Sequence, residues 1–328
     1  MSAMRGEDQT MIVFDAGKMR PYCAADLDRL LRFVSECNRT PSVSALPHPG
    51  DVVHHMSNTL RGRDLERHIF LYEQTGGRLR ALMMLYPGAT WSYELLLDPD
   101  LRNSGDDAFE AAALNWAGNM AWAASQSASQ STEVGEVGGD VTLGDTARQA
   151  ILKRLGYTST GAPYQLYTTR SLGDPIPEKP LPGGFTMRPV AGEHEAELVA
   201  AVHNGAFRPK WDAEKYLAVM RTPGFRSDRE LVVVAPDERF AAFVIIWLDP
   251  ICRSGLFEPV GCHRDFQGRG LASALMYEGM RRMHAAGMET AIVRYNADNI
   301  AGVPLYRSVG FQTRYQITEY RKLMPALA

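Results

Sequence analysis

Cysteine is scarce in this sequence, and its spacing excludes two classes of protein. Four of the 328 residues are cysteine and no two form a CxxC pair: Cys23, Cys37, Cys252 and Cys262. Such spacing indicates neither a disulfide framework nor a zinc site. The adjacent His54 and His55 lack an HExxH context, which predicts a place on the surface of a loop or helix and no metal role. We expect a metal-free protein in the reducing cytoplasm.

The sequence also lacks long apolar runs and an excess of either charge. No run approaches the roughly 18 apolar residues of a membrane-spanning helix, and the first residues lack the basic start and apolar stretch of a signal peptide. The net charge is −3, from 35 Lys and Arg against 38 Asp and Glu mixed along the chain. This balance provides no field to attract nucleic acid or an anionic membrane. The expected partner is a small molecule.

What the sequence does contain indicates two domains joined by a linker. With 328 residues and 45% hydrophobic side chains, the chain is long enough for about two cores. Residues 171–184 hold four prolines and three glycines between two strand-like stretches. We therefore predict a first domain over residues 1–170, a linker over 171–184 and a second domain over 185–328.

Hydrophobic periodicity predicts a mixed α/β order on both sides of this linker. In the second half we expect strands at 185–190, 230–236, 239–249, 256–262 and 290–297, helices at 192–204, 211–221, 270–286 and 300–308, and a strand pair after residue 311. In the first half we expect strands at 19–23, 68–74, 78–87, 90–98 and 164–170, and helices at 24–37, 107–124 and 146–155. A polar stretch at 125–140 begins with a low-complexity part, 125–134, that predicts a flexible loop. The halves look like a divergent repeat.

A glycine-rich loop in the second half predicts a phosphate site. The strand 256–262 leads into a loop with Gly268 and Gly270, and a helix begins at once with Leu271. Glycines let an anion approach the backbone, and the free amides and dipole of a helix start attract it. The loop has no GKS or GKT, and Ser273 occupies the third glycine position of GxGxxG. Neither a P-loop nor a dinucleotide fingerprint therefore explains it.

Two motifs resemble the GNAT acetyltransferase superfamily. Gln267-x-x-Gly270-x-Ala272 matches the family pattern Q/R-x-x-G-x-G/A. About thirty residues later an Asn precedes a Leu-Tyr pair and a Gly-Phe pair, as in the family, with Asn299, Tyr306, Gly310 and Phe311 at those positions. The resemblance covers roughly residues 185–324 and implies two tandem GNAT-like domains, each with a mixed, mostly antiparallel sheet flanked by helices. The tandem layout is similar to that of mycothiol synthases, whose second domain is active, and of many other bacterial GNAT proteins.

The resemblance implies that acetyl-CoA binds to the second domain as the acyl donor. The strand segment Val260, Gly261 and Cys262 would splay from its neighbour and offer backbone groups to the pantetheine arm, and Asn299 would bind that arm too. Arg264 would reach phosphate oxygens or simply face solvent, and the same alternatives hold for Arg269. The residues expected around the pyrophosphate are Gln267, Gly268, Arg269, Gly270, Leu271, Ala272 and Ser273.

The resemblance also implies that Tyr306 is the general acid that protonates the departing thiolate. With ordinary pKa values of about 10 for tyrosine and about 8.5 for a thiol, full transfer is uphill by ~2 kcal/mol. Tyr306 therefore needs a lowered pKa, or acts mainly as a hydrogen-bond donor. The alternative is a tyrosine that only caps the core.

Glu258 is the candidate general base, because strand alternation puts it on the same face as Val260 and Cys262. Family members tend to carry a glutamate base two residues earlier, where this chain has Leu256. A water chain or an acidic group of the substrate stays open as an alternative. Cys262 and His263 are adjacent on a strand and so point to opposite faces, which makes Cys262 a packed residue and not a nucleophile.

The predicted function is transfer of an acyl group to a primary amine of a small molecule. The family builds its acceptor pocket from the segment between the first two helices, here the aromatic stretch 207–216. His203, Phe207, Trp211 and Tyr216 therefore either shape that pocket or pack in the core. A catalytically silent acyl-CoA-binding or scaffold protein is the alternative function. A homo-oligomer is compatible with both.

The first half lacks a comparable loop. Its strand 90–98 enters a segment with one glycine and no Q-x-x-G-x-G/A pattern, and Asp106 and Asp107 stand where a helix start would receive phosphate. These carboxylates would cap the helix and repel pyrophosphate. We predict that this half binds no cofactor and instead supports the fold, walls the acceptor cleft or mediates oligomerisation.

Overall fold

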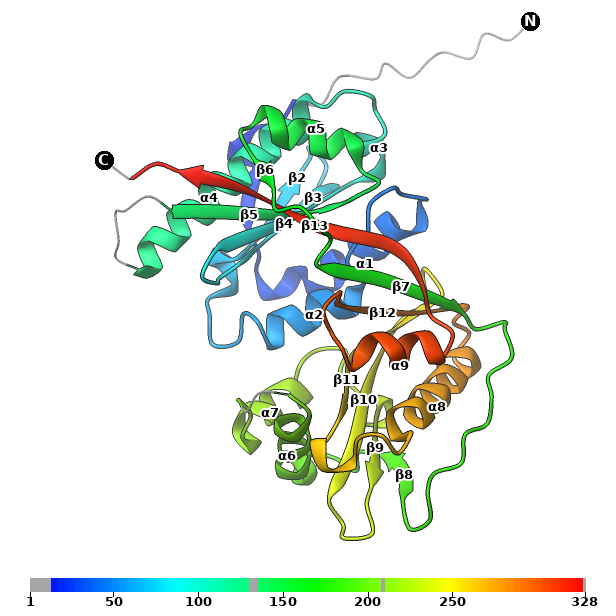
Figure 1. The fold of residues 1–328 in the computed structure, drawn as a ribbon. Helices are drawn as coiled ribbons and strands as arrows, with labels where there is room; N and C mark the ends of the chain where they lie inside the picture. The colour runs from blue at the N-terminus through cyan, green and yellow to red at the C-terminus, as the bar shows by residue number, and fades with distance from the viewer. Residues whose placement is uncertain (1–12, 130–134, 208–209, 327–328) are drawn as a thin grey trace, which may run out of the picture.

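The computed structural model describes residues 13–129, 135–207 and 210–326, and its strands form one continuous 13-stranded sheet (Figure 1). The first half contains β1 (Met19–Pro21), α1 (Leu27–Arg39), α2 (Pro49–Ser57), β2 (Ile69–Glu73), β3 (Leu79–Tyr86), β4 (Trp91–Leu97), α3 (Pro99–Arg102), α4 (Ala108–Ser129), β5 (Gly135–Thr142), α5 (Thr146–Arg154), β6 (Thr158–Ser159) and β7 (Gln165–Ser171). Apart from the short α3 and β6, the order is strand, two helices, three strands, helix, strand, helix, strand.

The second half repeats this order. It contains β8 (Thr186–Pro189), α6 (Ala196–Ala206), α7 (Ala213–Met220), β9 (Glu230–Val234), β10 (Phe240–Asp249), β11 (Ser254–Cys262), α8 (Leu271–Ala285), β12 (Thr290–Asn296), α9 (Gly302–Ser308) and β13 (Gln312–Met324). The sheet is mixed and mostly antiparallel, with helices on both faces. The predicted fold class is therefore confirmed.

Three sequence-based expectations need correction. The loop expected over 125–134 does not begin at residue 125, because α4 continues to Ser129; residues 130–134 lie outside the described chain. The polar stretch then continues as β5 from Gly135, a strand that was not predicted. The chain after residue 311 forms the single long strand β13 and not a strand pair. Finally, α2 was not predicted, although it carries His54 and His55.

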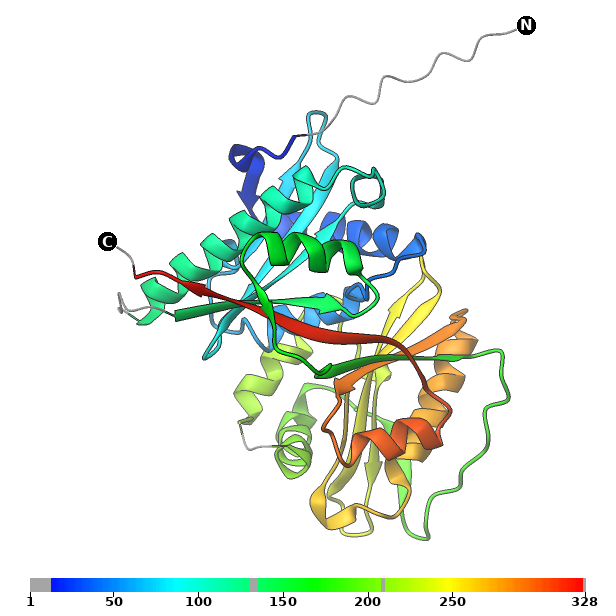
Figure 2. The same cartoon turned by 45° about the horizontal axis from the view of Figure 1, so that its top comes forward.

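The two halves exchange their last strands. The sheet order is β1-β2-β3-β4-β5-β13-β7-β12-β11-β10-β9-β8, so β13 pairs with β5 of the first half and β7 pairs with β12 of the second. Figure 2 shows β13 (red) crossing between the halves along β5 and β7. Residues 172–185 connect the halves without a helix or strand. In space, each half therefore includes the strand that ends the other.

The layers around the sheet also repeat. In the first half α4 and α5 pack on one face, and α1 and α2 on the other. In the second half α8 and α9 share one core with the sheet, and α6 and α7 form another. Each amphipathic helix thus buries its apolar side against the strands.

Helix α2 additionally joins the two halves. A buried apolar cluster combines Val53 of α2 with side chains from the sheet of the second half: Ile245, Trp247, Leu256 and Ile292. Gly50 lies so close to Trp247 that a Cβ there would be 2.4 Å from the Trp247 Cβ. His54 and His55 are accordingly partly buried at this junction, which corrects their expected place on the surface.

Among the described residues, no helix has both the length and the apolar character needed to cross a bilayer. The same residues hold no group of three or more His, Cys, Asp or Glu side chains suited to a metal ion. All four cysteines are free.

Candidate active site

The site is built on two neighbouring strands that separate. β11 and β12 run parallel, and their pairing covers only three positions, Ser254–Thr290 to Leu256–Ile292. Beyond these, β12 continues beside β7 while β11 continues beside β10. In the described chain no strand pairs with the inner edge of β11 after Leu256. The carbonyls of Glu258 and Cys262 accept from the side chains of Trp247 and Gln267. The remaining backbone groups on this edge have no partner strand in the described chain and are available to an extended ligand arm.

A β-bulge gives Glu258 its orientation. On β10 one residue separates Val244 from Ile246, whereas on β11 two residues, Glu258 and Pro259, separate their partners. A bulge of this kind turns side chains away from the regular alternation. The prediction of a shared face for Glu258 and Val260 relied on strict alternation, which does not apply across this point.

The glycine loop leads into the start of α8 as expected for a phosphate site. Gly268 and Gly270 have φ of 77° and 76°, a left-handed conformation that glycine adopts without strain. Gly270 is the N-cap of α8, where no side chain caps the helix, and the first turn contains no acidic residue. The start of α8 therefore keeps amides and a dipole available for an anion.

A lysine from the connection between the halves lies beside this loop. A Cβ placed on Gly270 would lie 3.0 Å from Cε and 3.3 Å from Nζ of Lys179. The ammonium thus adds positive charge next to the positive end of the helix dipole, an arrangement that an anion would stabilise. Sequence analysis did not identify Lys179, because nothing in the linker sequence shows where it folds back.

The other polar residues of the loop have partners within the protein. Gln267 donates to the Cys262 carbonyl at 3.2 Å. Arg264 donates to the carbonyls of Asn204 and Gly205 at the end of α6, which is a structural role. Arg269 is exposed and stacks over the rings of Phe185 and Phe266.

Leu271 and Ser273 are buried in the first turn of α8, and Ala272 is partly buried. Burial raises the pKa of Cys262 to about 11, so its thiol stays protonated and is a poor nucleophile at neutral pH. Gly261 packs against the ring of Phe243, where a Cβ would come within 2.4 Å of a ring carbon. These residues shape the backbone around the separated strand.

Asn299 and Tyr306 lie at opposite ends of α9. The Asn299 Oδ1 accepts a hydrogen bond from the Gly302 amide at 2.8 Å and so holds the helix start. Tyr306 is buried and stacks on Tyr295 with ring centroids 4.6 Å apart. Burial raises the Tyr306 pKa, and the charge of Glu258 raises it further. Tyr306 is therefore a neutral hydroxyl donor, and the lowered pKa that full acid catalysis would favour is not found.

Glu258 is a partly buried carboxyl with an unusual pKa. Burial raises its pKa to about 8, the negative charge of Asp51 raises it further, and Arg294 and Lys210 oppose the rise. Its Oε1 lies 3.6 Å from the Nε2 of His54, which belongs to the first half. Leu256, the position at which the family tends to carry its glutamate, is fully buried in the paired part of β11.

The four residues considered for the acceptor pocket divide into two groups. His203, Trp211 and Tyr216 are buried in one core cluster, where His203 stacks on Phe243 at 3.7 Å and the Tyr216 hydroxyl donates to Glu230. Phe207, at 44% exposure, remains accessible. The geometry thus favours core packing for the first three, the alternative that the sequence left open.

Comparisons with known proteins agree with this architecture. Residues 196–311 match the model of the Acetyltransferase (GNAT) family. A mycothiol acetyltransferase from Streptomyces bingchenggensis is 29% identical over 325 residues, which cover 93% of this chain and 94% of the relative. Residues 196–311 thus match a GNAT acetyltransferase domain, and the chain as a whole is similar to a mycothiol acetyltransferase.

Other matches are shorter or more distant. A mycothiol acetyltransferase from Frankia casuarinae is 25% identical over 195 residues, 55% of this chain and 56% of the relative; the chain spans about half the length of several relatives it matches. The structure of a tandem GNAT protein from the clavulanic acid biosynthesis pathway aligns with a TM-score of 0.63 at 14% identity, over 93% of this chain and 98% of that protein. This likeness shows a tandem GNAT fold.

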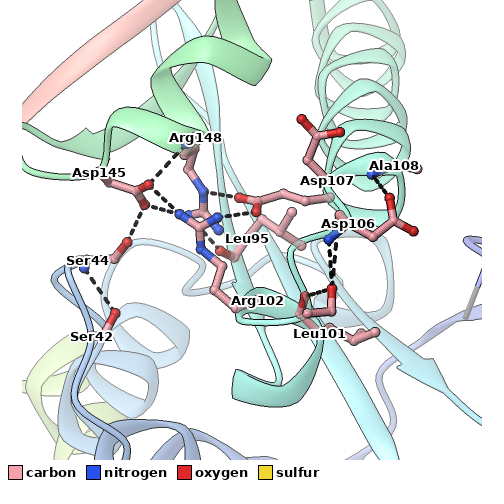
Figure 3. A network of polar contacts seen from close by, with 12 residues as sticks. Ser42, Ser44, Leu95, Leu101, Arg102, Asp106, Asp107, Ala108, Asp145 and Arg148 are labelled. Atoms are coloured by element: carbon pink, nitrogen blue, oxygen red, sulfur yellow. Dashed lines mark hydrogen bonds and ion pairs between the residues drawn. The ribbon is translucent and has the colours of Figure 1, made fainter. Parts of the chain in front are cut away.

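The first GNAT-like unit of the chain has the same separated strands, but its own side chains fill the space. β4 and β5 pair in parallel only from Trp91–Val137 to Tyr93–Gly139. Beyond them, Arg148 of α5 donates to the Leu95 carbonyl at 3.1 Å and to Glu110 at 2.6 Å (Figure 3). Arg102 contacts Glu110 and Asp145, and Ser44 contacts Asp145. This buried network lies beside β4, at the position in the first unit that corresponds to the unpaired edge of β11 in the second.

The helix start in the first unit is also closed. Asp106 accepts a hydrogen bond from the Ala108 amide at 2.9 Å, so a carboxylate caps α4, as predicted (Figure 3). Asp107 does not cap α4 and forms an ion pair with Arg154 at 2.7 Å. Aligning Gly156-Tyr157 with Gly310-Phe311 places Leu152 at the position of Tyr306. The first unit thus has no counterpart of the candidate acid.

Proposed function

We propose that this GNAT protein is an acyl-CoA-dependent N-acyltransferase that uses acetyl-CoA and acylates a primary amine of a small molecule. The observation that carries the proposal is the meeting of three features at one place. These are the unpaired edge of β11, the glycine start of α8 without an acidic residue in its first turn, and Glu258 close enough to Tyr306 to perturb its pKa.

The residues around the loop suit acetyl-CoA. Backbone amides of Gly268 to Ser273 and the Lys179 ammonium would hold the pyrophosphate, because both supply positive charge without a competing carboxylate. The free edge of β11 at Val260, Gly261 and Cys262 would hold the amide groups of the pantetheine arm. When bound, acetyl-CoA supplies the thioester whose carbonyl carbon forms a bond to the amine nitrogen as its bond to sulfur breaks.

The protein side chains would move the protons. Glu258, in its ionised form, accepts one proton from the ammonium of the acceptor and so frees the nitrogen lone pair. Tyr306 donates its hydroxyl proton to the departing sulfur and recovers it from solvent. Glu258 then loses its proton to solvent and the second nitrogen proton is released as well. With the one proton that Tyr306 takes up, each turnover releases one proton net.

The raised pKa of Glu258 suits this task. An acceptor with a lysine-like pKa of ~10.4 would lose a proton to an ordinary glutamate only against a gap of ~6 units. With Glu258 at about 8, the gap falls to ~2.4 units, or ~3 kcal/mol. The raised pKa also lowers the fraction of active base, because at pH 7 only about a tenth of Glu258 is ionised.

The acceptor would enter where α2 of the first unit faces the separated strands, because His54 of α2 lies 3.6 Å from Glu258. Several relatives are mycothiol acetyltransferases. The deacetylated form of mycothiol therefore belongs in the first panel of primary amines, together with amino sugars and free amino acids.

The test is release of coenzyme A from acetyl-CoA in the presence of this panel, for the parent protein and for Tyr306→Phe. We expect turnover to fall by about 10²-fold or more in the variant with acetyl-CoA affinity unchanged. Tyr295→Phe, which alters the stacked neighbour, is the matched control and should retain activity within about threefold. Equal background rates for parent and Tyr306→Phe would support the silent acyl-CoA-binding protein instead.

A further inference from the structure

His54 connects the first unit to the candidate base of the second. It lies on α2, and its side chain is 12% exposed. Its Nε2 atom is 3.6 Å from the Glu258 Oε1, across the junction of the two units. The shared apolar cluster fixes α2 against β10 and β11, so this approach is part of the folded core.

Hydrogen bonds around His54 decide which ring nitrogen carries the proton. Lys210 donates from Nζ to the Asn58 Oδ1 at 3.2 Å, which leaves the Asn58 Nδ2 to donate to the His54 Nε2 at 3.1 Å. Nε2 is then the lone-pair nitrogen and Nδ1 carries the hydrogen. Nδ1 is buried and finds no partner within the described residues. Burial, with His55 and Lys210 adding positive charge, lowers the His54 pKa to about 3, so the ring stays neutral.

We propose that α2 of the first unit completes the acyl-acceptor site, with His54 as the residue that positions Glu258 and favours its protonated form. The inference rests on the proposed function of Glu258. A neutral ring whose Nε2 lone pair lies near a carboxylate disfavours the anion, and the ring also keeps water away. Both effects make ionised Glu258 a stronger base toward an amine.

Other charged groups face this pair and enter the same balance. Asp51 favours the protonated carboxyl, and Arg294 and Lys210 oppose it. The Glu258 charge acts on Tyr306, and the His54 charge acts on His203. The titratable or charged neighbours to consider are thus Asp51, His55, His203, Lys210, Arg294 and Tyr306.

The experiment follows the Glu258 titration directly, without an acceptor. Full-length protein carrying ¹³C at the glutamate carboxyl carbons is titrated by NMR, and the Glu258 signal is assigned from its loss in Glu258→Gln. His54→Ala should lower the midpoint of the Glu258 titration by about one pH unit or more, since it admits water and removes the lone pair. His55→Ala is the matched control, because His55 packs on Tyr86 and contacts Thr59 instead; it should leave the midpoint within about 0.3 units.

An unchanged midpoint in His54→Ala, or equal changes in both variants, would overturn the inference. Should His54→Ala fail to fold, His54→Gln keeps a partner for Asn58 and should lower the midpoint in the same direction. Where an acceptor is found, the acid limb of the activity profile should move with the midpoint, whereas general damage would lower activity equally at every pH. A lowered midpoint in a protein that acylates no amine would retain the coupling and reject only the proposed function.

Discussion

The two units of this protein differ in what lies beyond the point where two parallel strands separate. In each, a parallel strand pair ends after three positions and leaves an open wedge. In the first unit Arg148, Glu110 and Asp145 fill the wedge, and a backbone carbonyl there is already bonded. In the second, the edge of β11 stays without a strand partner in the described chain. In the described chain, the candidate site is thus the wedge in which no partner strand and no arginine side chain bonds to the separated strand.

The closed unit has nevertheless kept a role at the open one. Because β7 and β13 are exchanged, each unit's part of the sheet contains a strand from the other half of the chain. Helix α2 then brings Asp51 and His54 to the side of Glu258. The first unit, which has no glycine loop of this kind, thus supplies side chains that surround Glu258.

The largest expected effect comes from reopening the closed wedge. In Arg148→Met, Glu110 and the Leu95 carbonyl lose a buried partner, so the free energy of unfolding should fall by about 3–5 kcal/mol. Arg154→Met, on the same helix but in an exposed ion pair with Asp107, should change it by less than about 1 kcal/mol. Urea unfolding of the three proteins measures both. Equal losses would show that the network does not hold the wedge closed.

The next effect is on catalysis at the open wedge. Glu258→Gln removes the base and should lower turnover by about 10²-fold or more. Leu95→Val changes the matching position of the first unit, counted from the first parallel pair of each, and should leave turnover within about threefold. Steady-state rates of coenzyme A release with the best amine are compared for the parent protein and the two variants. Similar losses in both would remove the distinction between the units.

Glu258 also predicts a pH dependence with a defined sign. Because its pKa is about 8, activity should fall about tenfold per pH unit below 8 as the carboxylate takes up a proton. A raised pKa in the folded state stabilises the protein at low pH, and this contribution is lost as pH rises through about 8. Glu258→Gln should therefore gain in melting temperature relative to the parent between about pH 5 and 9. A constant difference over that range would show an ordinary carboxyl.

The glycine loops offer a third test. Gly270→Asp places a carboxylate at the start of α8 and should abolish the stabilisation by acetyl-CoA, about 2.7 kcal/mol at one hundred times the dissociation constant. Gly105 has a similar φ of 77° in the loop of the first unit, and Gly105→Asp should leave that stabilisation intact. Melting temperatures with and without acetyl-CoA provide the readout. Loss in both variants would place the ligand elsewhere.

Sequence patterns predicted the repeat and the glycine loop before α8 because both depend on local chemistry. Phosphate binding by that loop stays a prediction. Hydrophobic periodicity located most of the strands but missed β5 and β6. The glycines before Leu271 indicated a helix start open to an anion. Asp106 was correctly predicted to cap its helix for the same reason. The bulge at Glu258 was not predictable, because it depends on how two strands pair.

Contacts between distant segments were beyond local patterns. Lys179 and His54 reach the site only through the path of the linker and the docking of α2. The helix α2 itself carried a readable signal, since Pro49 stands at its first position and Asp51 bonds back to the His48 amide at 2.8 Å. The composition of residues 125–140 did not reveal their structure. The serines at the start of this segment belong to the end of α4, and the glycines at its end belong to β5, which pairs with a strand on each side.

The smallest expected effect tests whether the cap of α4 matters for binding or only for stability. Asp106→Ala removes the acceptor for the Ala108 amide and should lower the free energy of unfolding by about 1 kcal/mol, whereas Asp106→Asn keeps a capping oxygen and should change it little. Neither variant should add a second acetyl-CoA site, because Arg148 still occupies the Leu95 carbonyl. Calorimetric titration counts the sites. A second site in Asp106→Ala would mean that the carboxylate, and not the filled wedge, keeps the first unit silent.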